Sequence, residues 1–115
     1  MAILAFTMPA GAGAKNYSNL GVAIQSCVVN SKDGKTNGIN VVFLSAHVTT
    51  VKEVDFLVVY NGRHYTLTDK GTFSRGAPIN HNLTNALVGE TWRGPLADVC
   101  AVKRVLLENG KIETT

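Results

Sequence analysis

Residues 60–81, YNGRHYTLTDKGTFSRGAPINH, hold most of the side chains whose types could do chemistry. They include His64, His81, Asp69 and Ser74, and a serine, a histidine and an aspartate can form a hydrolase triad, here with either histidine as the base. The residue two positions before Ser74 is threonine, so the GxSxG motif of a nucleophile elbow is absent. A hydrolase at Asp69, Ser74 and His81 is therefore a minor alternative, and we predict no enzyme and no cofactor.

Histidines also bind zinc, and the chain has three, His47, His64 and His81. Their equal spacing has no structural meaning without an internal repeat, and the sequence contains none. His64 follows a turn among polar neighbours and His47 begins a connection. We therefore predict no metal site.

Aromatic side chains offer another kind of site. Trp92 and Tyr65 could contact a sugar ring, with His81 as a neighbouring polar group, although such aromatics more often fill cores or edges. A small-ligand or carbohydrate-binding module that uses these three residues is therefore the alternative function.

Two cysteines, Cys27 and Cys100, lie far apart and form no CxxC pair, which argues against a zinc knuckle or a thioredoxin-type motif. They are either two buried thiols or one long-range disulfide. Each begins a strand-like run, CVVN and CAVKRVLL, which favours the disulfide.

Composition sets the class of fold. The chain has 115 residues, enough for one domain; 45% are hydrophobic and 17% charged, which argues against disorder. Abundant Val, Thr and Ile favour strands. The net charge is only +3 and the basic residues are scattered, so we expect no nucleic-acid partner.

Short apolar runs separated by turn residues predict strands. Asn61-Gly62 and Asn109-Gly110 are each typical of a type I′ hairpin turn. Turn-forming residues also predict a loop at 31–38 and a turn at 69–71. Asp69 and Ser74 are expected to bond to nearby backbone there. The expected strands are 2–8, 20–30, 39–46, 53–60, 63–68 and 99–107, with a short return in KIETT and an edge strand or irregular loop at 79–87.

Two details refine these strands. The apolar alternation in 99–107 slips at Lys103-Arg104, which predicts a β-bulge. Pro78 excludes a central strand just after it. About seven strands with hairpin connections predict an all-β, antiparallel, two-sheet sandwich that is immunoglobulin-like and occupies residues 15–115.

Residues 1–14 form a separate apolar strand and linker in this scheme. The apolar part is too short to span a bilayer, so we expect no membrane span. AGAGA resembles the small-residue end of a signal peptide, but no positively charged region precedes it. Ile3, Leu4 and Phe6 are the residues we expect to mediate assembly.

Several motifs follow one another in a recognisable order: Cys27, NVVFLSA, EVDFLVVY, TDKGTFSRGAPINHNL, and Cys100 before VKRVLLENGKI. This order resembles a family of small exported proteobacterial proteins of uncharacterised function, and GTFSxG followed by IxH is its specific part. The resemblance covers 27–111 and implies export, a small β-sandwich and a disulfide, but no enzyme. The chain departs from the family in lacking an intact signal peptide and the aromatic that often closes the last hairpin.

The leading hypothesis is a non-enzymatic exported β-sandwich that acts by association, as a self-assembling surface or filament subunit using its N-terminal strand. Its partner would be a second copy of the chain or another protein. We expect it to be secreted, periplasmic or at the cell surface.

Overall fold

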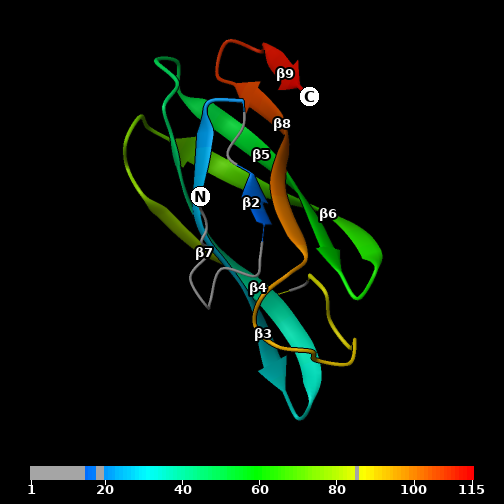
Figure 1. Cartoon of the computed structure of the whole chain (residues 1–115). Helices are drawn as coiled ribbons and strands as arrows, with labels where there is room; N and C mark the ends of the chain where they lie inside the picture. Colours follow the sequence, from blue (N-terminus) through cyan, green and yellow to red (C-terminus); the bar gives the residue numbers. More distant parts are fainter. Residues whose placement is uncertain (1–14, 18–19, 85) are drawn as a thin grey trace, which may run out of the picture.

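The computed structural model describes residues 15–17, 20–84 and 86–115, which form two stacked β-sheets (Figure 1). The larger sheet has the order β2-β8-β5-β6, with β9 also paired with β8, and the smaller sheet has the order β3-β4-β7. The predicted two-sheet β-sandwich is confirmed. The strands are β2 (Lys15–Tyr17), β3 (Val22–Lys32), β4 (Lys35–Ser45), β5 (Val51–Tyr60), β6 (Arg63–Phe73), β7 (Ile79–Leu83), β8 (Val99–Leu107) and β9 (Ile112–Thr114).

The named strands pair antiparallel except β2 and β8, which run parallel. β2 and β9 share one edge of β8, because β2 pairs with its first residues and β9 with its last. The strand predicted at 2–8 lies outside the described residues.

The core lies between the sheets and follows the alternation of the strands. Val54, Phe56 and Val58 of β5 are completely buried, as the period of two predicts. Phe43 of β4 packs edge-on against Phe56 of β5 and Phe73 of β6, with ring centroids 5.2 Å apart in both pairs. These aromatic contacts join the two sheets.

The predicted bulge in β8 is confirmed. Asp55 of β5 pairs with Arg104, whereas the next residue, Phe56, pairs with Val102. Lys103 is therefore the extra residue, and its side chain is exposed. The bulge restores the inward direction of Val105 after it.

The prediction of a loop at 31–38 was wrong. The turn is confined to Asp33 and Gly34, whose φ values of 54° and 77° are those of a two-residue hairpin turn. The polar residues after it belong to β4, because Thr36 pairs with Ser31 of β3. Cross-strand pairing overrides the turn propensity of KTN.

The turn predicted at 69–71 was also wrong, because β6 continues to Phe73. Asp69 pairs with Val54 of β5, and its side chain is buried. Asp69 therefore does not form a turn. The chain leaves the larger sheet only after Phe73, and residues 74–78 connect β6 to β7.

The two Asn-Gly turns differ. Asn61-Gly62 is the predicted type I′ turn, with φ of 52° and 74°. The same prediction for Asn109-Gly110 was wrong, because only Gly110 has a positive φ, 87°. The Gly110 N–H donates to the Leu107 carbonyl at 2.9 Å, so a longer loop ends in a left-handed glycine.

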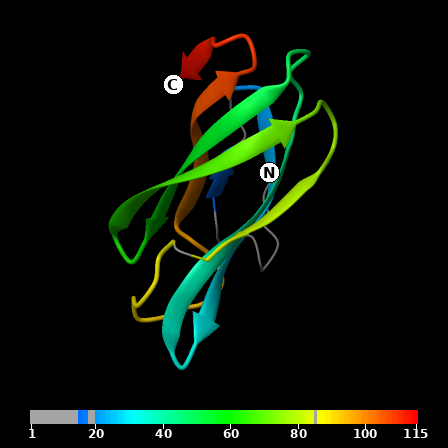
Figure 2. The same ribbon diagram turned by 180° about the vertical axis from the view of Figure 1, so that it is seen from behind.

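The sandwich has two long sides along which edge strands of the two sheets face each other (Figures 1 and 2). On the β3–β8 side, β3 lies near β8 and β2. On the β6–β7 side, a side-chain contact joins β6 to β7, and β7 is the edge strand allowed by Pro78.

Candidate functional site

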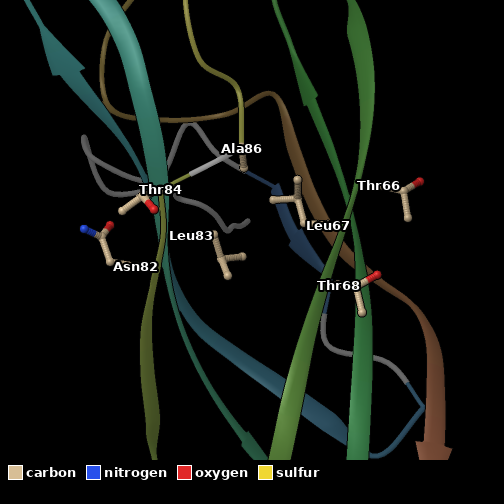
Figure 3. Close-up of a pocket in the computed structure, with 7 residues that line it drawn as sticks. All are labelled: Thr66, Leu67, Thr68, Asn82, Leu83, Thr84 and Ala86. Carbon is tan, nitrogen blue, oxygen red and sulfur yellow. The ribbon is translucent and has the colours of Figure 1, made fainter.

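One hollow of the described surface lies on the β6–β7 side, where it forms a pocket of about 420 Å³. Figure 3 shows its two walls, one from β6 and the other from the end of β7 and the residues after it. The buried Leu67 and the partly buried Leu83 and Ala86 give it an apolar floor. Polar side chains form the rest of the lining: Thr66, Thr68, Asn82 and Thr84.

The alternation of the two edge strands explains this lining. Inward positions on β6 are Tyr65, Leu67 and Asp69, so one leucine lies between two polar residues. Inward positions on β7 include His81 and Leu83, which pair with the buried Val41 and Ile39 of β4. Apolar residues therefore face each other in the pocket, with polar residues beyond them.

One polar contact lies beyond the pocket, at the Asp69 end of β6. The His81 Nδ1 donates to the Asp69 Oδ2 at 2.5 Å. The Asp69 side chain is 5% exposed and that of His81 46% exposed, so a buried carboxylate is satisfied by a half-exposed imidazole. Phe73 contacts the same imidazole, with ring centroids 6.4 Å apart.

A second polar contact lies beyond the other end of the pocket, next to Thr66. The Tyr65 hydroxyl donates to the Glu90 carboxylate, and Arg63 Nη1 lies 3.5 Å from Glu90 Oε2. Burial, and then the hydrogen bond and charge of Glu90, raise the pKa of the Tyr65 phenol above its usual value. Tyr65 therefore remains a hydrogen-bond donor at all ordinary pH values.

Asp69 and His81 reproduce two members of the hydrolase triad considered above. An aspartate on Nδ1 orients an imidazole so that Nε2 can act as a base. Ser74 lies in the connection after β6, and among the described residues no hydroxyl makes a hydrogen bond with His81 Nε2. The contact therefore satisfies the buried Asp69 carboxylate.

The three candidate ligand residues have different neighbours. Tyr65 and His81 make the contacts at the two ends of the pocket, without lining it. Trp92 is 37% exposed, and its indole N–H donates to the Val29 carbonyl of β3 at 3.3 Å. The structure therefore brings Tyr65 and His81 to the same side, while Trp92 fastens a connecting segment to the β3–β4 hairpin.

The remaining histidines are placed apart from this site. His64 is exposed on β6, and the His47 Nε2 lies 2.6 Å from the Leu20 carbonyl and 3.4 Å from Glu113 Oε1. Over residues 15–17, 20–84 and 86–115, no three His, Cys, Asp or Glu side chains lie close enough to share a metal ion.

The opposite, β3–β8 side is closed by the predicted disulfide. Cys27 of β3 and Cys100 of β8 are bonded, with their Cα atoms 6.6 Å apart, and both are buried. The bond thus joins the smaller sheet to the larger one. It is compatible with an oxidising, exported location.

Two functional features escaped the sequence analysis. Glu90 was not considered, and no local pattern signals that it would meet Tyr65, which is 25 residues away. Asp69 was assigned to a turn, although the alternation of Tyr65, Leu67 and Asp69 continues the inward face of β6 and could have indicated its burial. Ile3, Leu4 and Phe6, the predicted assembly residues, lie outside the described residues.

In the described part of the chain, no helix has the length and apolar character needed to cross a membrane. Comparison with known protein families, with characterised proteins and with solved structures found no match for this chain. The geometry of the β6–β7 side is therefore the basis on which a function can be argued.

Proposed function

We propose that the protein is an exported, non-enzymatic β-sandwich that assembles by strand addition. The apolar segment containing Ile3, Leu4 and Phe6 of one copy enters the β6–β7 side of the next copy. The observation that carries this proposal is the pocket with an apolar floor between two sheet edges. Export is supported by the disulfide and by the resemblance to exported proteobacterial proteins.

The β6–β7 side has the features that an added strand needs. β6 is an edge strand whose described strand partner is β5 alone, so its other edge presents unpaired backbone groups. An extended segment that pairs with such an edge gains backbone hydrogen bonds, and adjoining pockets take alternate side chains. Leu4 and Phe6 are two residues apart, so in a strand both would face the pocket.

Polar residues limit where a strand can enter. Asp69 is an inward-pointing charged residue on β6, and β7 is short and follows Pro78. Both features hinder edge-to-edge pairing. Addition is therefore restricted to the half of β6 between Arg63 and Thr68, which is the half that borders the pocket.

The position of β2 favours a second copy as the acceptor. β2, the described strand that follows the donor segment in the sequence, pairs with β8 on the β3–β8 side, opposite the pocket. Donor and acceptor surfaces are different, so the contact is heterologous and can continue from copy to copy as a filament.

The test is the mass in solution, measured by light scattering, of the wild type and of two blocked variants. Leu4→Asp places a charge in the donor strand, and Ala86→Phe fills the pocket. We expect the wild type to form oligomers and each variant to be monomeric. A mixture of the two should form only a dimer, because Ala86→Phe retains a donor and Leu4→Asp retains a pocket.

Ala5→Asp is the matched control, since it adds the same charge on the opposite face of an extended strand. It should still assemble. A wild type that stays monomeric, a Leu4→Asp variant with the mass of the wild type, or a mixture that remains monomeric would each contradict the proposal. Circular dichroism of every variant verifies that the sandwich is folded.

A further inference from the structure

The outward face of the smaller sheet is rich in asparagine. Five asparagines lie on β4, β7 and the end of β3: Asn30, Asn37, Asn40, Asn80 and Asn82. The direct register places Val28, Asn40 and Asn82 side by side across the three strands. Since the chain has ten asparagines, half of them are on this one face.

Hydrogen bonds between these amides fix their orientation. Asn30 Nδ2 donates to Asn82 Oδ1 at 2.7 Å, although β4 lies between their strands. Asn40 Nδ2 donates to Asn80 Oδ1 at 2.8 Å. Each bond uses one amide nitrogen as donor and one amide oxygen as acceptor. Asn30 and Asn40 therefore keep an oxygen that can accept from a ligand. Asn80 and Asn82 keep a nitrogen that can donate to one.

Gly38 helps to shape the face. It has a φ of 90°, and a Cβ at this position would lie 2.8 Å from the Leu83 carbonyl oxygen. The absent side chain lets Leu83 and Thr84, at the end of β7, approach β4 closely.

The amides surround a shallow hollow of about 450 Å³, whose lining contains no charged side chain. Val28 gives it an apolar spot beside the amide groups. The lining residues are Val28, Asn30, Asn37, Asn40, Asn82 and Thr84.

We propose that this hollow binds a neutral, polyhydroxylated ligand, a hexose unit of a glycan. Each hydroxyl of a sugar is both a donor and an acceptor, and oriented amides offer both roles in alternation. The carbon face of the ring can pack on Val28. A free sugar and the end of a polysaccharide share this chemistry.

Other ligand classes fit this hollow less well. A phosphate or carboxylate is normally held by Arg or Lys, and neither lines the hollow. A nucleic acid needs basic residues along its backbone. This site differs from the aromatic one predicted from sequence, because Trp92, Tyr65 and His81 do not line it.

Nuclear magnetic resonance of ¹⁵N-labelled protein tests the proposal through the side-chain amide signals of asparagine. The probes are glucose, galactose, mannose, N-acetylglucosamine and their disaccharides, with glucuronate and glucose 6-phosphate as charged comparators. We expect at least one neutral sugar to shift the signals of Asn40 and Asn82 in a saturable manner. The charged comparators should cause smaller shifts.

Asn82→Asp keeps the acceptor for Asn30 but removes the donor, and should weaken sugar binding about ten-fold. Asn109→Asp is the matched control, because Asn109 is in an exposed turn where its Oδ1 accepts from the Lys111 N–H, as aspartate also can. It should bind like the wild type.

No saturable shift with any neutral sugar would overturn this proposal. So would full binding by Asn82→Asp, or a preference for the charged probes. Because Asn82 and Thr84 line both the pocket and this hollow, the titration is also done with the Leu4→Asp variant, in which strand addition is blocked. Sugar binding by that variant tests the hollow apart from assembly.

Discussion

The two long sides of the sandwich are closed by different chemistry. On the β3–β8 side, a disulfide joins the sheets and β2 covers part of the edge of β8. On the β6–β7 side, two hydrogen-bonded polar contacts, Asp69 with His81 and Tyr65 with Glu90, lie on either side of a pocket. The first side is held by a covalent bond, whereas the second is held by hydrogen bonds that water or a partner could replace.

This difference assigns a separate role to each side. The disulfide links two residues that are 73 positions apart in the sequence and holds the two sheets together covalently. A protein that accepts a strand between its sheets needs such a fixed side, because insertion otherwise separates them. The predictions below test this division of roles, from the largest expected effect to the smallest.

Reduction of the disulfide should cause the largest loss of stability. For a loop of this length we expect the free energy of unfolding to fall by about 4 kcal/mol, because the unfolded chain gains freedom. Denaturant titration with and without reductant measures the change. The double variant Cys27→Ala/Cys100→Ala is the control, and its stability should not respond to reductant. Two free thiols in the oxidised, unfolded protein would contradict the prediction.

Loss of His81 should have an intermediate effect. His81→Ala leaves the buried Asp69 carboxylate without its imidazole partner, and should lower the free energy of unfolding by about 2 kcal/mol. His64→Ala removes an exposed histidine from the neighbouring strand and should cost less than about 0.5 kcal/mol. Denaturant titration compares the two. A double-mutant cycle with Asp69→Ala should show coupling, and additive losses would mean that the contact contributes nothing.

The Tyr65 contact should have the smallest effect and a characteristic pH dependence. A raised pKa means that the folded protein holds the phenol proton more tightly than the unfolded chain. The stabilisation is therefore complete below the unfolded value of 10.0 and is lost as the pH rises above it. At neutral pH, the free energy of unfolding of the wild type should exceed that of Tyr65→Phe by about 1 kcal/mol.

Stability measurements of both proteins from neutral to alkaline pH check this behaviour. The advantage of the wild type over Tyr65→Phe should shrink as the pH rises above 10.0. A difference in the free energy of unfolding that stays constant over this range would contradict the hydrogen bond from the Tyr65 hydroxyl to Glu90.

The fold could be predicted from sequence where local signals and pairing agree. Alternation in β5 identified its buried face, and the parity slip at Lys103 identified a bulge, because both depend on neighbours along the chain. The errors at 31–38 and 69–71 share another cause. Turn-forming residues there are held in strands by partners on β3 and β5, and pairing across strands leaves little trace in one sequence.

The candidate sites were harder to predict for the same reason. The contact of Asp69 with His81 and the meeting of Asn30 with Asn82 depend on how two sheets stack and three strands align. The partners are distant in the sequence, 12 residues apart for Asp69 and His81 and 52 for Asn30 and Asn82, so no local pattern links them. The cysteines were the exception, because each begins a strand-like run in the sequence and their pairing could be expected, although Cys27 lies in the middle of β3.

The position of β2 has a mechanical consequence. In a row of copies joined as proposed, tension along the donor segment enters the sandwich at Lys15 and passes from β2 through β8 and β5 to β6, the strand that holds the next copy. This load crosses the larger sheet through its backbone hydrogen bonds. The disulfide anchors β8 to β3, so the smaller sheet shares the strain at the point where the load arrives.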